Sequence, residues 1–162
     1  MARAQGIKGG GDRLVSKNRR AYFNYEITDT FEAGLVLIGS EARSLREGSA
    51  DLTDAWVDID RRGEAWVKGM RIPQLKHAAF GHLDDRPRKL LLHKEQIESL
   101  RGLRERDGMT LIATKCYIKN NRAKLEVAVA RGKKTHDKRH SIKAKEADRE
   151  ARQAMRSGRR GP

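Results

Sequence analysis

The sequence has little of several residue types on which common structural sites depend. Its 162 residues include one cysteine, three prolines and two tryptophans, and aromatic residues make up 5%. A single cysteine excludes an internal disulfide and a cysteine-rich zinc site. No apolar run approaches the roughly 20 residues that span a bilayer, and no apolar segment near the N-terminus indicates a secretory signal. We therefore expect a cytoplasmic protein without a membrane partner.

Motifs for catalysis are also missing. Residues 132–135 (GKKT) resemble part of a phosphate-binding loop, but Val127 and Lys134 stand where that loop needs glycine and a hydroxyl residue. There is no G-x-S-x-G motif, and Cys116 lies in an expected strand, where buried packing is the simpler role. The five histidines are scattered. We predict no enzymatic activity, no cofactor and no metal site.

Positive charge is abundant and unevenly placed. Lysine and arginine number 36 against 22 acidic residues, a net charge of +14, which favours a polyanionic partner. Residues 1–20 carry +5, residues 21–130 carry +1 and residues 131–162 carry +8. All aromatic residues lie between Tyr22 and Tyr117. We predict a flexible basic arm at 1–17, a folded body at 18–130 and a basic tail at 131–162 that is disordered when free.

The residue pattern of the body predicts mainly β structure. Hydrophobic alternation and turn residues predict six strands, at 21–28, 31–38, 55–60, 64–72, 110–118 and 124–130. Asn120 and Asn121 tolerate the positive φ of a hairpin turn. A short helix is expected between a Ser40 cap and Gly48, and a longer one at 94–107 before Gly108. Residues 74–88 are expected to form a loop. These elements predict a small antiparallel β-barrel or sandwich with flanking helices.

Four segments together resemble one family. They are EAGL at 32–35, GSEARSLREG at 39–48, RKLLLH at 88–93 and GKKTHDKR at 132–139. In order and spacing they are similar to SmpB, the SsrA-binding proteins that partner transfer-messenger RNA, with Ala42-Arg43 in place of the usual Val-Lys. The resemblance implies a six-stranded β-barrel of the oligonucleotide-binding type that binds the tRNA-like domain of this RNA. It also implies delivery to stalled ribosomes together with elongation factor Tu and GTP.

The resemblance implies RNA-binding roles for Glu32, Leu91 and Lys124. From its residue type alone Glu32 would be an ordinary surface carboxylate, although a carboxylate can accept from base amino groups. Leu91 fits a core position as well as an exposed contact to an unstacked base, and Lys124 fits a phosphate contact. We further predict that a mostly basic set lines the RNA groove: Asn18, Arg19, Arg20, Tyr22, Arg43, Arg46, Arg88 and Lys89.

The tail is predicted to bind the ribosome. If it becomes helical from about Ser141, four basic side chains fall on one stripe and alanines on another. About 15 residues make a marginal isolated helix, so we expect the helix on the ribosome only. The resemblance implies that the tail enters the small-subunit decoding centre, where His136 can stack on a purine, and the empty message channel. The predicted ribosome-binding residues are Gly132, Lys133, Lys134, His136, Asp137, Lys138, Arg139, Ile142, Lys145, Arg149, Arg152 and Arg156.

Two other classes of protein share parts of this pattern. A ribosomal protein with basic extensions that bind ribosomal RNA has the same neutral body and charged arms. An RNA nuclease or RNA-modifying enzyme would need a convergent acid–base or metal site, which the sequence does not show. We expect a monomer.

Overall fold

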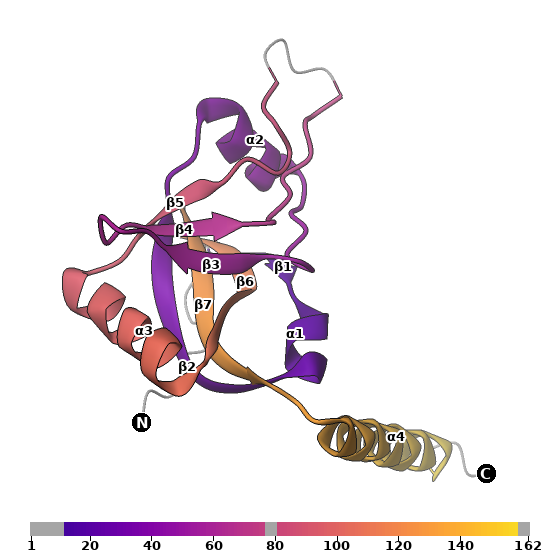
Figure 1. Ribbon diagram of the computed structural model, residues 1–162. Helices are drawn as coiled ribbons and strands as arrows, with labels where there is room; N and C mark the ends of the chain where they lie inside the picture. The colour runs from indigo at the N-terminus through magenta and orange to yellow at the C-terminus, as the bar shows by residue number, and fades with distance from the viewer. Residues whose placement is uncertain (1–11, 77–80, 159–162) are drawn as a thin grey trace.

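The computed structural model describes residues 12–76 and 81–158, and within them seven antiparallel strands form one sheet (Figure 1). The sheet closes on itself because β7 pairs with both β2 and β6. Six strands thus make a barrel in the order β6-β3-β4-β5-β2-β7, and β1 pairs with residues 115–118 of β6, further along the strand than the pairing of β3 at Ile112. The strands are β1 (Arg13–Lys17), β2 (Tyr25–Leu35), β3 (Trp56–Ile59), β4 (Ala65–Lys68), β5 (Arg88–Leu91), β6 (Thr110–Lys119) and β7 (Arg122–Gly132). The predicted mainly β fold with flanking helices is confirmed.

Four helices surround or leave the barrel: α1 (Arg19–Asn24), α2 (Gly39–Glu47), α3 (Lys94–Asp107) and α4 (Thr135–Gly158). Helix α3 lies along the barrel wall and inserts Leu100 fully into the core, with Ile97 and Leu103 packed beside it. It ends as predicted at Gly108, whose φ of 61° is in the left-handed region. None of the helices in the described parts of the chain is long and apolar enough to cross a membrane.

The core explains why the strand prediction succeeds for the two hairpins. Along β3 and β4 the inward side chains Val57 and Val67 face each other and are buried. Along β6 and β7, Leu111 and Leu125 point into the same core. The turn between these long strands contains Asn120 and Asn121 with φ of 51° and 60°, which confirms the predicted positive φ.

The predicted strands at 21–28 and 31–38 are correct only in part, since residues 25–28 and 31–35 belong to one continuous strand, β2. Residues 19–24 form helix α1 because the Asn18 side chain caps it, accepting from the Ala21 N–H at 3.1 Å. The Asn18 amide also donates to the carbonyls of Leu52 and Ala113, at 2.8 and 3.1 Å. After this helix β2 runs unbroken through Asp29 and Thr30, the two residues that separate the predicted strands. A register shift between Ile27 and Asp29 interrupts the strict alternation instead.

Strands β1 and β5 were not predicted. β1 lies inside the segment expected to be a flexible arm and pairs with β6, while residues 1–11 lie outside the described residues. The Arg13 guanidinium, at the start of β1, donates to three carbonyls at the end of α2: those of Arg46 at 2.6 Å and of Leu45 and Gly48 at 3.1 Å. These bonds satisfy carbonyls that a helix end leaves without partners. The arm therefore orders the end of α2.

Helix α2 differs from its prediction at one end. Its first turn is capped by the Glu41 carboxylate, which accepts from the Ile38 N–H at 3.1 Å, and not by Ser40. The Ser40 hydroxyl instead lies 3.0 Å from Nδ1 of the buried His82. At the other end Gly48 closes the helix, as predicted, through its N–H to the Ser44 carbonyl at 2.8 Å.

Helix α4 leads away from the barrel and buries none of its residues (Figure 1). Its base contacts α1, where Lys133 Nζ donates to the Tyr22 carbonyl at 3.3 Å and to the Ser141 hydroxyl at 2.9 Å. Lys145 Nζ lies 5.7 Å from the centre of the Phe23 ring. Residues 135–158 are helical in the structure, and the helix on the ribosome stays a prediction. Disorder of the tail in the free protein stays a prediction.

Candidate nucleic-acid interface

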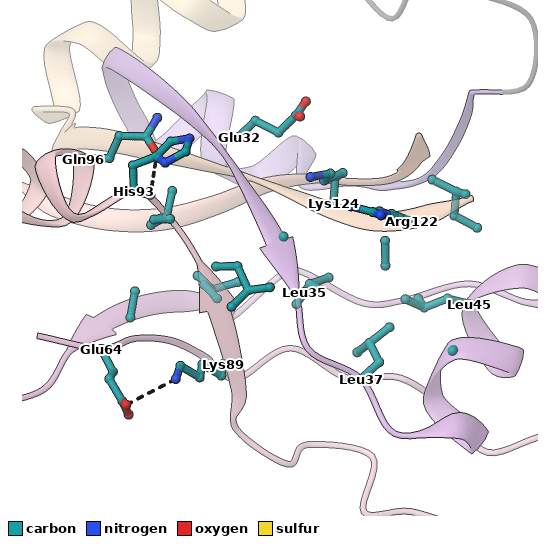
Figure 2. Close-up of a pocket in the computed structure, with 18 of the residues that line it drawn as sticks. Glu32, Leu35, Leu37, Leu45, Glu64, Lys89, His93, Gln96, Arg122 and Lys124 are labelled. Atoms are coloured by element: carbon teal, nitrogen blue, oxygen red, sulfur yellow. Dashed lines mark hydrogen bonds and ion pairs between the residues drawn. The ribbon is translucent and has the colours of Figure 1, made fainter. Parts of the chain in front are cut away.

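An open groove of about 970 Å³ lies between β2, β5, α2 and the turn that joins β6 to β7 (Figure 2). Five of the residues predicted to bind RNA line it, although they come from four separate elements. They are Glu32, Arg46, Lys89, Leu91 and Lys124. A groove that gathers residues 32 to 124 in one place is the feature on which a binding function depends.

Strand register brings close together the three residues to which the family resemblance assigns RNA binding, Glu32, Leu91 and Lys124. Gly34 on β2 pairs with Lys124 on β7 and with Leu91 on β5, so these residues form one row across three strands. Glu32 is two residues from Gly34 and points to the same face of β2. Leu91 is 58% exposed, which decides between the two roles that the sequence left open: it is a surface side chain.

Gly34 makes room for Leu91 in this row. A Cβ at position 34 would lie 3.3 Å from the Leu91 Cβ and 3.6 Å from its Cδ1. The leucine side chain therefore lies against the bare backbone of β2. The absence of a side chain at Gly34 therefore sets how far the Leu91 side chain protrudes from the surface of the groove.

The groove presents more free positive than negative charge. Lys89 pairs with Glu64 at 3.2 Å, and Lys119 lies 3.5 Å from Glu32. Within the described residues, the other cations of the groove have no acidic partner within 4.0 Å; they are Arg46, Arg122 and Lys124. Together the groove offers cations for phosphates, an exposed leucine for a base, and the carboxylates of Glu32 and Glu64, of which Glu64 pairs with Lys89.

Two predicted groove residues are buried, which corrects their expected position. Asn18 is 6% exposed and holds the start of α1 through the three bonds described above. Arg88 is fully buried: its Nε donates to Glu41, and its terminal nitrogens donate to the carbonyls of Met70 at 2.7 Å and Asp84 at 2.9 Å. A buried carboxylate needs such a partner, so Arg88 holds α2 against β5 and does not face a ligand.

Four other predicted residues are exposed but lie outside the groove. Arg43 pairs with Glu47 at 3.3 Å on the outer side of α2. Arg19, Arg20 and Tyr22 belong to α1. Arg20 lines a second, smaller pocket of about 440 Å³. Lys17 Nζ lies 5.0 Å from the centre of the Tyr22 ring. The structure therefore does not bring these residues to the row formed by Leu91 and Lys124.

The groove also contains residues that the sequence reasoning missed. Arg122 lies two residues before Lys124 on β7 and faces the same side, a spacing of two that could have revealed it. His93 and Gln96 come from the start of α3, where the Gln96 side chain accepts from the His93 N–H at 3.1 Å. Tyr117 does not line the groove, but it donates to Glu32 from two strands away, a contact that only the closed barrel reveals.

The predicted ribosome-binding residues continue from the end of β7 along α4. Gly132 is the last residue of β7 and pairs with Tyr25. None of the twelve is buried. They are Gly132, Lys133, Lys134, His136, Asp137, Lys138, Arg139, Ile142, Lys145, Arg149, Arg152 and Arg156. Arg152 pairs with Asp148 at 3.0 Å along the helix, and His136 lies 3.7 Å from Asp137.

Comparisons with known proteins agree with this geometry. The model of the family described as SmpB protein matches residues 15–157. The chain belongs to the SmpB family. A relative from Sorangium cellulosum (strain So ce56), named SsrA-binding protein, is 49% identical over 151 residues, 93% of each chain. One of the same name from Thermobifida fusca (strain YX) is 46% identical over 150 residues, 92% of this chain and 93% of the relative.

A solved structure has the same fold. It is described as "tmRNA-SmpB: a journey to the center of the bacterial ribosome", and it matches with a TM-score of 0.63 and 37% identity. The match covers 75% of this chain and 85% of the other. Among the described residues of the SmpB-family chain, no group of three or more histidine, cysteine, aspartate or glutamate side chains is placed to hold a metal ion.

Proposed function

We propose that this protein binds the tRNA-like domain of transfer-messenger RNA and accompanies that RNA to stalled ribosomes, as a component of trans-translation. The observation that carries the proposal is the row of Lys124, Gly34 and Leu91 with Glu32 beside it in one groove. Family membership and the names of the relatives support it.

The groove suits an RNA that is recognised by shape and by a few bases. The body has a net charge near zero, so bulk attraction to RNA falls mainly to the basic tail and arm. Within the groove, Arg46, Arg122 and Lys124 can reach phosphates, which positions the RNA. Leu91 offers an apolar surface to an unstacked base, and Glu32 can accept a hydrogen bond from a base amino group.

Replacing Glu32 by alanine tests this assignment through the sign of its effect. If Glu32 is only a surface acid near RNA, its removal relieves repulsion and tightens binding. If it accepts from a base, its removal weakens binding by about 10-fold, the cost of one charge-assisted hydrogen bond. The matched control is Glu26→Ala, which removes an exposed glutamate from the same strand outside the groove. Binding of a synthetic tRNA-like RNA that tightens or stays unchanged in Glu32→Ala would contradict the proposal.

We propose that the tail senses an empty message channel. A message in the channel would occupy the same space as α4, so the discrimination is competitive exclusion. Truncation before Ile142 is expected to leave RNA affinity within about threefold, because the groove is intact, but to abolish tagging of stalled products in a reconstituted translation assay. Loss of both RNA binding and tagging in the truncated protein would contradict separate roles for the body and the tail.

The basic stripe of α4 can be tested by salt dependence. Replacing Lys145, Arg149, Arg152 and Arg156 by glutamine should reduce the slope of log affinity for ribosomes against log salt by up to about 0.7–0.9 per lost phosphate contact. The control is Lys143→Gln together with Glu146→Gln, which changes the same helix without altering the stripe. An unchanged slope in the stripe variant would show that these side chains do not touch phosphate.

We further propose that the protein is a monomer that acts in the cytoplasm together with elongation factor Tu and GTP. It has no catalytic activity of its own. The ribosomal-protein alternative is not favoured by the family match. Sequencing of the RNA that copurifies with the protein separates the two. One dominant RNA with a tRNA-like end is expected, whereas ribosomal RNA alone, retained through high salt, would favour the alternative.

A further inference from the structure

The Glu32 carboxylate is held in place by two side chains of β6, although β7 lies between β6 and Glu32's own strand. The Tyr117 hydroxyl donates to Glu32 Oε2, and Lys119 Nζ lies 3.5 Å from the same oxygen. No described residue donates to the second oxygen, Oε1. Glu32 therefore has one oxygen bound to the protein and one available to a ligand.

Tyr117 is built to stay a hydrogen-bond donor. Its side chain is 7% exposed, and burial together with the adjacent Glu32 carboxylate raises the pKa of its hydroxyl far above the usual range. It keeps its proton at every physiological pH. A glutamate on an exposed strand otherwise samples several rotamers, which a ligand would have to restrict on binding. The bond from Tyr117 restricts them before RNA arrives.

We propose that Tyr117 is a positioning residue that fixes Glu32 so that its free oxygen accepts a hydrogen bond from the exocyclic amino group of an unstacked RNA base. This inference rests on the function proposed above. It also sets a specificity, because adenine, cytosine and guanine carry an exocyclic amino group and uracil does not. The base that meets Glu32 is therefore one of those three.

A double-mutant cycle tests the link between the two residues. The affinity of a synthetic tRNA-like RNA is measured for the wild type, Tyr117→Phe, Glu32→Ala and the double variant. We expect Tyr117→Phe to weaken binding about 3- to 10-fold with an unchanged salt slope, since no phosphate contact is lost. In the Glu32→Ala background the same change should have an effect within about twofold. The control Tyr25→Phe removes a hydroxyl from a half-buried tyrosine outside the groove and should change nothing.

The outcomes separate this inference from the proposed function. A Tyr117→Phe protein with wild-type affinity overturns the positioning role, and so does a loss of affinity that is as large in the Glu32→Ala background as in the wild type. A Glu32→Ala protein with undiminished affinity overturns both the positioning role and the assignment of Glu32 to RNA binding. Thermal unfolding shows whether each variant is folded.

A second measurement covers the case in which Tyr117→Phe fails to fold. Each unpaired adenine, cytosine and guanine of the RNA is replaced in turn by uracil, and binding to the wild type and to Glu32→Ala is compared. We expect one position at which uracil weakens binding to the wild type by about 10-fold but leaves binding to Glu32→Ala unchanged. If no position distinguishes the two proteins, the amino-group contact is overturned.

Discussion

Replacing Glu41 by glutamine should destabilise the protein more than any single surface change. Glu41, on α2, is fully buried and accepts from Arg86, from Arg88 and from the Ile38 N–H. Glutamine keeps the size of the side chain but removes its charge, and it turns one acceptor into a donor that faces an arginine. The buried Arg88 guanidinium then lacks its counter-charge.

The magnitude follows from what each arginine retains. Removing one partner of a buried ion pair costs about 3–5 kcal/mol. Arg86 can turn toward water because its side chain is 34% exposed, and Arg88 keeps its bonds to the Met70 and Asp84 carbonyls. Both facts place the expected cost near the lower end, about 3 kcal/mol. With an m-value of about 2 kcal/mol/M, the urea midpoint should fall by about 1.5 M.

The same variant has a pH signature. Burial opposes ionisation of Glu41, but the hydrogen bonds from Arg86, the Ile38 N–H and Arg88 outweigh it and lower its pKa. A lowered folded-state pKa stabilises the protein above the unfolded-state value, about 4.3, and this contribution disappears as the pH falls through the folded-state value. The difference between wild type and Glu41→Gln should therefore be constant near neutral pH and shrink below about pH 4.

Equilibrium urea unfolding at several pH values measures both effects. The matched control is Glu47→Gln, in the same helix, whose pair with Arg43 is exposed on both sides and should be worth at most about 0.5 kcal/mol. A cost below about 1 kcal/mol for Glu41→Gln, or a difference that grows in acid, would refute the reasoning.

Three further predictions concern other parts of the fold. Gly34→Ala should push Leu91 outward by a few tenths of an ångström and weaken RNA binding about 2- to 5-fold, with a melting temperature close to that of the wild type; an unaffected affinity would show that the height of Leu91 is unimportant. Arg13→Ala should lower the free energy of unfolding by about 1–3 kcal/mol, because three carbonyls at the end of α2 lose their donor, and urea unfolding measures it. Burial raises the pKa of the Cys116 thiol to about 12, so a thiol reagent at pH 8 should react with the native protein only at the rate of unfolding; rapid labelling would mean that the core between β6 and β7 opens locally.

Regular alternation and turn chemistry allowed the two hairpins β3–β4 and β6–β7 to be predicted from sequence, but not β5 between them. The hairpins at 55–72 and 110–130 and the helix before Gly108 each depend on residues close together in the chain. Helix α1 could not be predicted in this way, since residues 21–28 alternate like a strand. What decides its conformation is Asn18, whose amide binds carbonyls at positions 52 and 113. Hydrogen bonds to residues so distant in sequence do not change the local hydrophobic periodicity, so periodicity cannot predict them.

The same limit explains the errors at the site. An arginine next to a lysine, as at positions 88 and 89, is normally read as a charged surface, and Lys89 does line the groove. Arg88 points inward because Glu41, far away in sequence, is buried opposite it. By contrast, Glu32, Leu91 and Lys124 came from motif positions of the family, and the strand register brings all three together.

The strand pairing has a consequence for how this protein is made. Arg13 of β1 meets Ile118 of β6, and β2 pairs along almost its whole length with β7, which ends at Gly132. Strand pairs so far apart in sequence form late, and a protein that depends on them folds slowly. During synthesis the barrel cannot close before β7 has emerged, because β7 pairs with both β2 and β6, and unpaired strand edges favour aggregation until then. A nascent chain interrupted before β7 lacks the strand that forms one side of the groove. Unfinished copies therefore cannot compete with finished ones for RNA.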